Sequence, residues 1–359
     1  MKKILVTGAN GYLGSVLVPY LKNNNRTYDI LAFDVGFFKK CILYKYPKDK
    51  IIYKDVRNIS KLDLKKIDAI VHLAGISNDP LNKLSPDLIY NPTRKYTLRL
   101  AQLAKSLNIR FIFASSCSVY GATNTKSLLN ENSRTNPQTG YSLNKLQIEK
   151  DLEKIADKNF FPICLRFATI FGMSKRIRFD LVINMLVAMA VVNKKIILNS
   201  DGRAWRPNLY IEDACSAIDN ALKYKKTKKD KKILILNVGR NENNLKIIDI
   251  AKKIKNLVKG SKIIFLNKNL VNSDLILDKK IKDGKDQRTY KVSFNKIKKN
   301  FINYNCKYTV ENGIKKMIKD LKKIKFNDKN LFNKKFYRLQ YLEYLYQKKK
   351  INSSLKWKT

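Results

Sequence analysis

The sequence predicts an α/β protein in which a parallel β-sheet is covered by helices on both faces. Over the first two-fifths of the chain, short apolar runs alternate with stretches of helical periodicity. The apolar runs lack the polar alternation of a half-exposed strand, so each strand is expected to be buried on both sides. With 359 residues, the chain is long enough for one large domain or two intergrown ones.

The expected elements follow in regular order up to residue 114 and irregularly beyond residue 172. No long Pro-, Gly- or Ser-rich linker divides the chain, so we expect two interwoven lobes. The boundaries are 1–172 for the first domain with 209–240 returning to it, 173–208 and 241–324 for a second lobe, and 325–359 for a tail. Strands are expected at 4–6, 30–33, 51–53, 69–71, 110–114, 233–236 and 263–265, and helices at 12–22, 96–107, 245–257 and 310–324.

The net charge of +45 permits two interpretations. Clustered Lys and Arg are typical of nucleic-acid binders. Here, however, the Lys residues are spread along the whole chain among many Asn and Ile residues, and no zinc-finger, RRM or basic-zipper pattern accompanies them. We therefore favour a compositional bias, with a general attraction for anions and no specific nucleic-acid partner.

The cysteine pattern and hydropathy indicate a cytoplasmic protein. Five cysteines are scattered without a Cys-x-x-Cys pair, which predicts neither a disulfide framework nor a metal site. The opening residues do not resemble a signal peptide. The longest apolar run, 181–192, is shorter than the ~20 residues that a membrane-spanning helix needs.

A glycine-rich loop lies directly between the first expected strand and the first expected helix. Glycines at this place allow a tight turn and a close approach of the backbone to a pyrophosphate, which then faces the helix N-terminus. The loop predicts a Rossmann-type dinucleotide site whose candidate residues are Gly8, Asn10, Gly11, Tyr12, Leu13 and Gly14.

Two carboxylates follow the next strands. Asp34 closes the second strand, where an acidic side chain binds the adenosine ribose hydroxyls and repels a ribose phosphate, so NAD is favoured over NADP. Its alternative role is a cap or turn residue. Asp55, followed by Val56, comes after the third strand and is placed either to accept a hydrogen bond from the adenine amine or to cap a solvated turn.

The candidate catalytic residues form a Tyr-Lys-Ser group. Tyr141 and Lys145 are four residues apart and therefore share one helical face. A neighbouring ammonium stabilises the phenolate of a Tyr whose free pKa is ~10, so that Tyr can exchange a proton with a hydroxyl. The segment 115–121 follows the strand at 110–114, which places its hydroxyls at the edge of the sheet where ligands bind.

Together these motifs resemble the extended short-chain dehydrogenase/reductase family, in its nucleotide-sugar epimerase and dehydratase branch. The resemblance extends from residue 1 to about residue 317. It implies an NAD-binding Rossmann domain of the doubly wound type and a smaller C-terminal substrate lobe. It also implies a homodimer in which the helix carrying Tyr141 and the helix at 96–107 pack against their mates.

The resemblance assigns roles to individual residues near the cofactor. Ser116 matches the active-site Ser/Thr, Tyr141 the catalytic Tyr, and Lys145 the Lys that also holds the nicotinamide ribose. Asn91 matches an Asn on the helix before the active-site strand, with a helix cap as the alternative. Further residues near the cofactor are Leu73, Ala74 and Gly75, which follow His72, the only histidine and the one we interpret as structural.

The resemblance also assigns residues to the substrate. Asn184 corresponds to a contact of the nucleotide diphosphate, and Arg206 and Arg288 to phosphate-binding arginines. A guanidinium holds phosphate oxygens through two hydrogen bonds, which distinguishes Arg from the many Lys residues. Each of the three has an alternative role as a surface residue. Cys117 and Ser118, next to Ser116, are also expected at the substrate, with Cys117 as a packing residue and not a nucleophile.

Two departures limit the functional prediction. Dehydratases of this branch carry Asp-Glu where this chain has Cys117 and Ser118, which disfavours dehydration. The aromatic tail 325–359 exceeds the usual domain, and we expect it to pack on the body rather than bind a partner or a membrane.

The predicted function is NAD-dependent epimerisation of a nucleotide sugar by transient oxidation at a ring carbon. The alternatives are an NAD(P)-dependent reductase or dehydrogenase acting on a nucleotide sugar, a catalytically inactive scaffold, and a nucleic-acid binder. Retention of Tyr141, Lys145 and Ser116 together argues against an inactive scaffold.

Overall fold

The large domain is built on a parallel sheet. The computed structural model describes residues 1–44, 50–77, 86–123, 127–265 and 288–358. Within them a seven-stranded sheet has the order β10-β6-β5-β4-β1-β2-β3, and every neighbouring pair is parallel, which confirms the predicted fold class. The strands are β1 (Lys2–Thr7), β2 (Tyr28–Asp34), β3 (Ile51–Tyr53), β4 (Ala69–His72), β5 (Arg110–Ser116), β6 (Ile163–Phe167) and β10 (Leu234–Val238).

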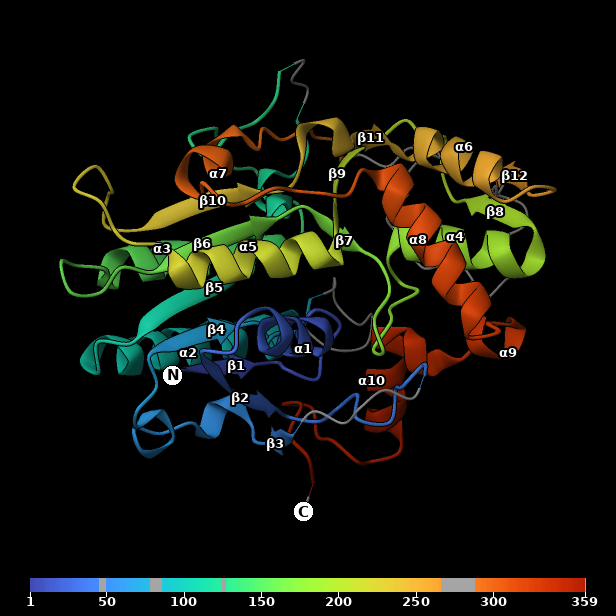
Figure 1. Cartoon of the computed structure of the whole chain (residues 1–359). Helices are drawn as coiled ribbons and strands as arrows, with labels where there is room; N and C mark the ends of the chain where they lie inside the picture. The colour runs from blue at the N-terminus through green and yellow to red at the C-terminus, as the bar shows by residue number, and fades with distance from the viewer. Residues whose placement is uncertain (45–49, 78–85, 124–126, 266–287, 359) are drawn as a thin grey trace.

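Helices cover both faces of this sheet (Figure 1). Successive side chains of a strand point to opposite faces, so Ile4 and Val6 of β1 pack with α1 (Gly14–Asn24) and α5 (Ile211–Lys223). Leu5, between them, packs in a second cluster with α2 (Pro86–Ser106) and α3 (Gly140–Ile155). The chain is therefore doubly wound, with the sheet buried on both sides.

Helix α2 begins ten residues before the predicted start at residue 96. Pro92 lies inside it, although proline disfavours a helix interior. Tertiary contacts hold this first part in place: Tyr90 is 5% exposed, and Asn144 Nδ2 donates a hydrogen bond of 2.8 Å to its carbonyl oxygen.

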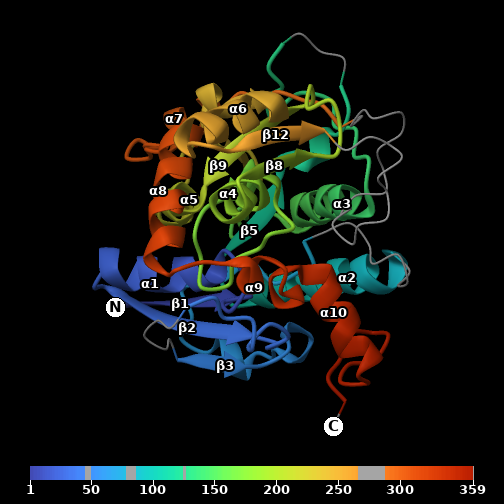
Figure 2. The same cartoon turned by 90° about the vertical axis from the view of Figure 1, so that its right-hand side faces the viewer.

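The smaller lobe has its own core. Its strands form a three-stranded sheet of order β11-β9-β7 and a parallel pair β12-β8, which lie beside α4, α6 and α8 (Figures 1 and 2). Between β9 and β11 the chain returns to the large domain to form α5 and β10. The elements are β7 (Thr169–Phe171), α4 (Val182–Asn193), β8 (Lys195–Leu198), β9 (Trp205–Tyr210), β11 (Asn244–Lys246), α6 (Ile247–Leu257), β12 (Lys262–Phe265) and α8 (Val310–Lys323).

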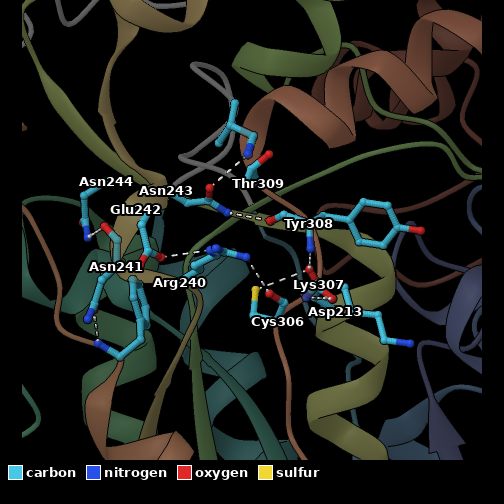
Figure 3. Close-up of polar contacts among 12 residues, drawn as sticks. Asp213, Arg240, Asn241, Glu242, Asn243, Asn244, Cys306, Lys307, Tyr308 and Thr309 are labelled. Atoms are coloured by element: carbon cyan, nitrogen blue, oxygen red, sulfur yellow. Dashed lines mark hydrogen bonds and ion pairs between the residues drawn. The ribbon is translucent and has the colours of Figure 1, made fainter.

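Polar side chains fix the segment that leads from the large domain into α8 (Figure 3). Asp213, at the start of α5, accepts hydrogen bonds of 2.9 Å from the backbone N–H groups of Lys307 and Tyr308. Asn243 donates to the carbonyl oxygen of Tyr308 at 3.0 Å and accepts from the N–H of Val310 at 2.9 Å. Burial raises the pKa of Asp213, and these backbone donors oppose that shift. The buried polar contacts thus join the large domain to the segment that leads into α8.

The tail packs on the body, the alternative that we favoured. Phe336 lies in the core of the smaller lobe, 5.9 Å from Phe179 between ring centroids. The following helix, α10 (Arg338–Gln347), packs in another cluster against Phe37 and Tyr90 of the large domain. The remaining short helices are η1 (Val56–Asn58), η2 (Leu62–Leu64), η3 (Cys117–Tyr120), η4 (Asn241–Asn243), α7 (Asn295–Asn300), α9 (Asp328–Leu331) and η6 (Lys334–Phe336).

Hydropathy adds one observation about these helices. Among those described, none combines the length and the apolar character needed to cross a membrane.

Candidate functional site

A cavity of about 540 Å³ lies at the carboxyl ends of the parallel strands. This is the edge at which open α/β sheets bind ligands. The loop 8–14, the ends of β2, β4 and β5, the start of α3, residues of the smaller lobe and the tail all contribute to its wall. Most of the residues predicted for the site are therefore brought together in one place.

The glycine-rich loop is packed too closely for side chains. Gly8 has a φ of +71°, and a Cβ on it would lie 2.8 Å from the backbone nitrogen of Ala74. A Cβ on Gly14, where α1 begins, would lie 2.3 Å from the carbonyl oxygen of Gly8. The α1 N-terminus therefore opens onto the cavity, as an anion site requires. The loop residues in the wall are Gly8, Gly11, Tyr12, Leu13 and Gly14.

Asn10, predicted as a cofactor contact, lies outside the wall of the main cavity and lines a small second one beside Gly11 and Tyr12. Its Oδ1 accepts hydrogen bonds from Arg176 Nε and Nη2 at 3.0 and 2.9 Å. Its backbone N–H donates to Asp34 Oδ2 at 3.0 Å. Asn10 thus holds the loop to β2 and to the smaller lobe.

The two predicted carboxylates differ in their surroundings. Asp34 lines the cavity at the end of β2, and its Oδ1 accepts a 2.7 Å hydrogen bond from the N–H of Gly36. Burial raises the pKa of Asp34, opposed by its backbone donors. Asp55 and Val56 also line the cavity, but Arg57 already binds the Asp55 carboxylate, with 2.6 Å between Nη2 and Oδ2. Asp34 is therefore the better placed acceptor for a ribose.

Lys145 and Tyr141 meet in the cavity wall beneath β5. Lys145 Nζ donates a 2.6 Å hydrogen bond to the carbonyl oxygen of Ala114 and lies 5.7 Å from the centroid of the Tyr141 ring. Burial lowers the pKa of Lys145 to about 8, with the charge of Glu149 opposing the shift. The ammonium is thus held beside the phenol that it was predicted to influence.

The start of α3 fixes Tyr141 in the first helical turn. Thr139 Oγ1 accepts from the N–H of Ser142 at 3.2 Å, and Ser142 Oγ accepts from the N–H of Thr139 at 3.0 Å. This reciprocal cap satisfies donors that the helix itself leaves free. Ser116, the third member of the predicted group, lines the same cavity and caps η3 by accepting from the N–H of Ser118 at 3.1 Å.

A buried ion pair that sequence reasoning missed supports this group. Glu149 lies one helical turn after Lys145 and pairs with Arg166 of β6 at 2.7 Å, with both side chains at most 5% exposed. Ser115 also donates a hydrogen bond to Glu149. The pair ties α3 to β5 and β6. The only sequence signal was the spacing of Lys145 and Glu149 along one helix face.

Cys117 does not reach the cavity, which corrects its place among the predicted substrate contacts. It is 1% exposed, and its thiol donates to the carbonyl oxygen of Arg166 at 3.1 Å. Burial raises the pKa of the thiol, so Cys117 is a neutral packing residue. Ser118 does line the cavity, and its buried Oγ has no hydrogen-bond partner among the described residues.

His72 is a buried, neutral structural residue. Its Nδ1 lies 2.7 Å from Thr7 Oγ1 and its Nε2 lies 3.0 Å from Thr97 Oγ1. Burial lowers its pKa to about 3. The three residues that follow it, Leu73, Ala74 and Gly75, line the cavity.

Helix α2 places residues other than the predicted Asn91 in the cavity wall. Asn91 is exposed and lies outside the cavity wall, whereas Thr93 and Tyr96 line it. Each helical residue turns the side chain by ~100°, so Asn91 faces away from the direction of Thr93. Thr93 accepts a 3.3 Å hydrogen bond from Tyr96 Oη. The predicted role of Asn91 as a cofactor contact is corrected accordingly.

Asn184 is fully buried and makes all its contacts within the protein, which corrects its predicted role at the substrate diphosphate. Its Oδ1 accepts from the N–H of Gly172 at 3.0 Å. Its Nδ2 donates to Tyr12 Oη at 3.1 Å and to the carbonyl oxygen of Arg178 at 3.0 Å. Asn184 therefore helps to position Tyr12 and Arg178, which line the cavity, without lining it itself.

Five arginines line the cavity: Arg57, which binds Asp55, and four others, of which sequence reasoning found two. Arg206 and Arg288 are both in the wall, and the Arg206 guanidinium lies 5.8 Å from the centroid of the Tyr290 ring. Arg178, which pairs with Asp180 at 2.9 Å, and Arg338 of the tail were missed. No local motif marks either residue, because both are placed by contacts between distant segments.

Two curated relatives illustrate what the chain is similar to. The chain is 27% identical to the dTDP-D-glucose 4,6-dehydratase of Dictyostelium discoideum over 281 residues, which cover 72% of this chain and 62% of that relative. It is 28% identical to the UDP-glucose 4-epimerase of Lactobacillus helveticus over 275 residues, 70% of this chain and 81% of the relative.

A solved structure has the same fold. The UDP-glucuronic acid 4-epimerase of Bacillus cereus, in complex with UDP-glucuronic acid and NAD, aligns with a TM-score of 0.70 at 23% identity, covering 90% of this chain and 99% of that chain. The model of the NAD dependent epimerase/dehydratase family matches residues 4–239, more than half of the chain. This protein therefore belongs to the NAD dependent epimerase/dehydratase family.

Proposed function

We propose that this protein is an NAD-dependent epimerase acting on a nucleotide sugar. The observation that carries the proposal is that Ser116, Tyr141 and Lys145 line the same cavity as the glycine-rich loop and Asp34. A hydroxyl-bearing substrate in this cavity would meet the proton-transfer group and the dinucleotide site at once. Its relatives include a UDP-glucose 4-epimerase, which supports a sugar nucleotide as substrate.

The residues present fit a dinucleotide. The α1 N-terminus offers backbone N–H groups to a diphosphate. In the hydrogen bonds described, the Asp34 carboxylate accepts only from backbone donors, at 2.7 and 3.0 Å. It therefore offers further lone pairs to a ribose. Bound NAD would supply an acceptor of hydride and, in the return direction, a donor.

Tyr141 is proposed as the general base and acid. It would take a proton from a sugar hydroxyl through its Oη and later return it, while Lys145 stabilises the phenolate and Ser116 holds the reacting oxygen. Arg206 and Arg288 would bind the diphosphate of the substrate through charged hydrogen bonds. With NAD supplying the hydride exchange, the net result would be inversion of one sugar carbon without net oxidation.

Two rival reactions use the same cavity. A nucleotide-sugar reductase or dehydrogenase would need the same three residues but would consume cofactor. Dehydration needs an acid and a base beyond Tyr141, and the positions after Ser116 offer a buried neutral thiol and a hydroxyl instead. We therefore place dehydration last.

The experiment that tests the proposal is product chromatography on the purified protein with a panel of UDP-, GDP- and dTDP-sugars and a trace of NAD. We expect a sugar isomer in large excess over the added NAD. Turnover that stops when NAD is used up, or that starts only with NADH or NADPH, would establish the reductase or dehydrogenase instead.

We also propose a homodimer formed through α2 and α3. The two helices lie side by side on one face of the sheet, joined by an ion pair of 2.5 Å between Arg94 and Asp151. Leu107, just after α2, and Leu143 of α3 are 39% and 45% exposed. A second copy related by a two-fold axis would cover these apolar side chains.

A further inference from the structure

The C-terminal segment forms part of the wall of the main cavity. After η6 the chain passes the cavity with Tyr337, Arg338, Leu339 and Gln340, and it returns to the cavity with Ser354 and Leu355. None of these residues belongs to the region matched by the family model. The tail thus supplies a wall that the motifs of the large domain do not provide.

Contacts at both ends of this segment hold it against the dinucleotide side of the cavity. At its far end, Trp357 Nε1 donates a 2.7 Å hydrogen bond to the carbonyl oxygen of Val35, one residue after Asp34. Arg57 Nη2, which also binds Asp55, donates to the carbonyl oxygen of Leu355 at 2.6 Å. The tail is therefore fastened next to both carboxylates predicted for the adenosine.

Arg338 is the charged residue that the tail brings into the wall. Its Nη1 donates a 2.6 Å hydrogen bond to Ser77 Oγ, which also accepts from Arg178 Nη1 at 2.9 Å. Its guanidinium lies 5.0 Å from the centroid of the Phe38 ring. Two guanidinium groups thus converge on one hydroxyl at the cavity surface.

The charges around Ser77 favour an anion. Arg178 already binds Asp180 through Nε and Nη2 at 2.9 Å each, whereas the hydrogen bond described for Arg338 goes to the Ser77 hydroxyl and not to a carboxylate. Burial, followed by the charge of Arg178, lowers the pKa of Arg338 to about 9. A bound anion would relieve the cost of holding two like charges together.

The position of Arg338 indicates which anion. Arg338 lines a small second cavity together with Gly11 and Tyr12 of the glycine-rich loop. That loop leads into the N-terminus of α1, where the diphosphate of a dinucleotide would lie. Arg206 and Arg288, assigned to the substrate, belong to the smaller lobe and to the segment before its α8.

We infer that the C-terminal segment completes the dinucleotide site and that Arg338 binds the diphosphate of the cofactor. The inference rests on the proposed function only in that the cavity holds a dinucleotide. It makes no assumption about the sugar or the reaction. A protein that fails to epimerise any sugar but binds NAD through Arg338 would overturn the proposed function and leave this inference standing.

The test measures binding and needs no turnover. Protein freed of cofactor is titrated calorimetrically with NAD, ADP-ribose, adenosine and UDP at about 150 mM salt, which suppresses non-specific attraction of anions to the Lys-rich surface. We expect Arg338→Gln to weaken NAD and ADP-ribose at least about tenfold, the scale of a charge-assisted hydrogen bond. Adenosine, which lacks the diphosphate, and UDP should bind within about twofold of wild type.

Two further variants keep the result interpretable. Lys348→Gln removes one exposed charge at the end of α10 and should leave all four affinities unchanged. Arg338→Lys keeps the charge but loses the planar fork, and its affinity for NAD should lie between those of wild type and Arg338→Gln.

Three outcomes would overturn the inference. Unchanged NAD affinity in Arg338→Gln would show that the residue does not bind the cofactor. Selective loss of UDP would make it a substrate residue. Equal loss of adenosine and ADP-ribose would make its role structural.

Discussion

Among single residues, Lys145 shows a strong effect of burial. The residue is 8% exposed, and its ammonium is hydrogen-bonded to one carbonyl and lies 4.5 Å from the centroid of the Phe113 ring. An unfolded Lys titrates near ~10.4, whereas burial lowers the pKa in the folded protein to about 8. Between these values the unfolded state binds more protons, so this residue makes the free energy of unfolding rise with pH.

Lys145→Met should remove that pH dependence. The free energy of unfolding of wild type minus that of the variant should increase from about pH 8 to about pH 10.5, by at most ~1.4 kcal/mol per pH unit. Urea titrations across this range measure it. Lys150→Met, which removes an exposed Lys from the same helix, serves as the control. A flat difference for Lys145→Met would mean that its ammonium is not destabilised by burial.

Tyr141→Phe should abolish catalysis and spare the fold. Removing the group that transfers the proton should lower turnover by about 10²- to 10⁴-fold. The NAD content of the purified protein should not change, since the phenol ring remains. Product chromatography and extraction of bound nucleotide measure the two effects. Tyr346→Phe, at a Tyr that is 41% exposed in the tail, serves as the control, and equal turnover in the two variants would exclude Tyr141 as the acid and base.

The sequence predicted which residues lie near the site better than it predicted which way their side chains point. Ser116, Tyr141, Lys145 and Asp34 line the cavity, because Ser116 and Asp34 end strands that the pattern located and Tyr141 and Lys145 share one helix face through their spacing. Asn10, Cys117 and Asn184 lie next to such places but turn toward the protein. A polar side chain beside a site satisfies its hydrogen bonds on either side, and only the three-dimensional arrangement decides which.

At the scale of elements, α3 carries two of the proposed catalytic residues, Tyr141 and Lys145, and an ion pair of Glu149 ties it to β6. Glu149→Ala would leave the Arg166 guanidinium buried without its carboxylate, which costs about 3–5 kcal/mol of unfolding free energy. Glu242→Ala breaks the pair with Arg240, in which both side chains are partly exposed, and should cost less than about 1 kcal/mol.

Chemical unfolding of the two variants measures this difference. Adding Arg166→Met to Glu149→Ala should recover part of the lost stability, since no unpaired charge then remains. Equal stabilities of Glu149→Ala and Glu242→Ala would show that the pair does not hold α3.

Element boundaries were predicted where local chemistry sets them. The strand at 110–114 and the helix at 310–324 match β5 and α8 closely. Helix α2 was predicted too short because Pro92 disfavours a helix locally, while burial of Tyr90 and its hydrogen bond from Asn144 outweigh that preference. Asn91 was assigned from the family resemblance and not from this boundary, whereas Thr93, two residues later, is the one that lines the cavity.

At the scale of the molecule, the doubly wound sheet followed from the alternation of apolar runs and helices. The place of the tail did not follow from this pattern, because Arg338 contacts Ser77 across a separation of 261 residues. The tail was expected to pack, and it does. That it would pack against the cavity could not be read from its composition.

The proposed dimer gives a prediction at this scale. Leu143→Asp, on the exposed face of α3, should convert the dimer to a monomer, since a charge would be buried in the interface. Light scattering after size-exclusion chromatography measures the mass. Leu62→Asp, at a residue that is 74% exposed elsewhere on the large domain, should leave the dimer intact. A wild-type protein that elutes as a monomer at all concentrations would contradict the interface.

The five free cysteines have a use that is independent of catalysis. All are buried, and they are distributed over separate hydrophobic clusters: Cys41 lies beneath the tail, whereas Cys164 lies inside the large domain. Because a buried thiol reacts with a labelling reagent only after local opening, the labelling rate of each cysteine reports how readily its surroundings open. Mass spectrometry of labelled peptides should find Cys41 reacting before Cys164, and Trp357→Ala should accelerate Cys41 alone. Cysteine labelling can therefore follow the separation of the tail from the large domain independently of the unfolding of that domain.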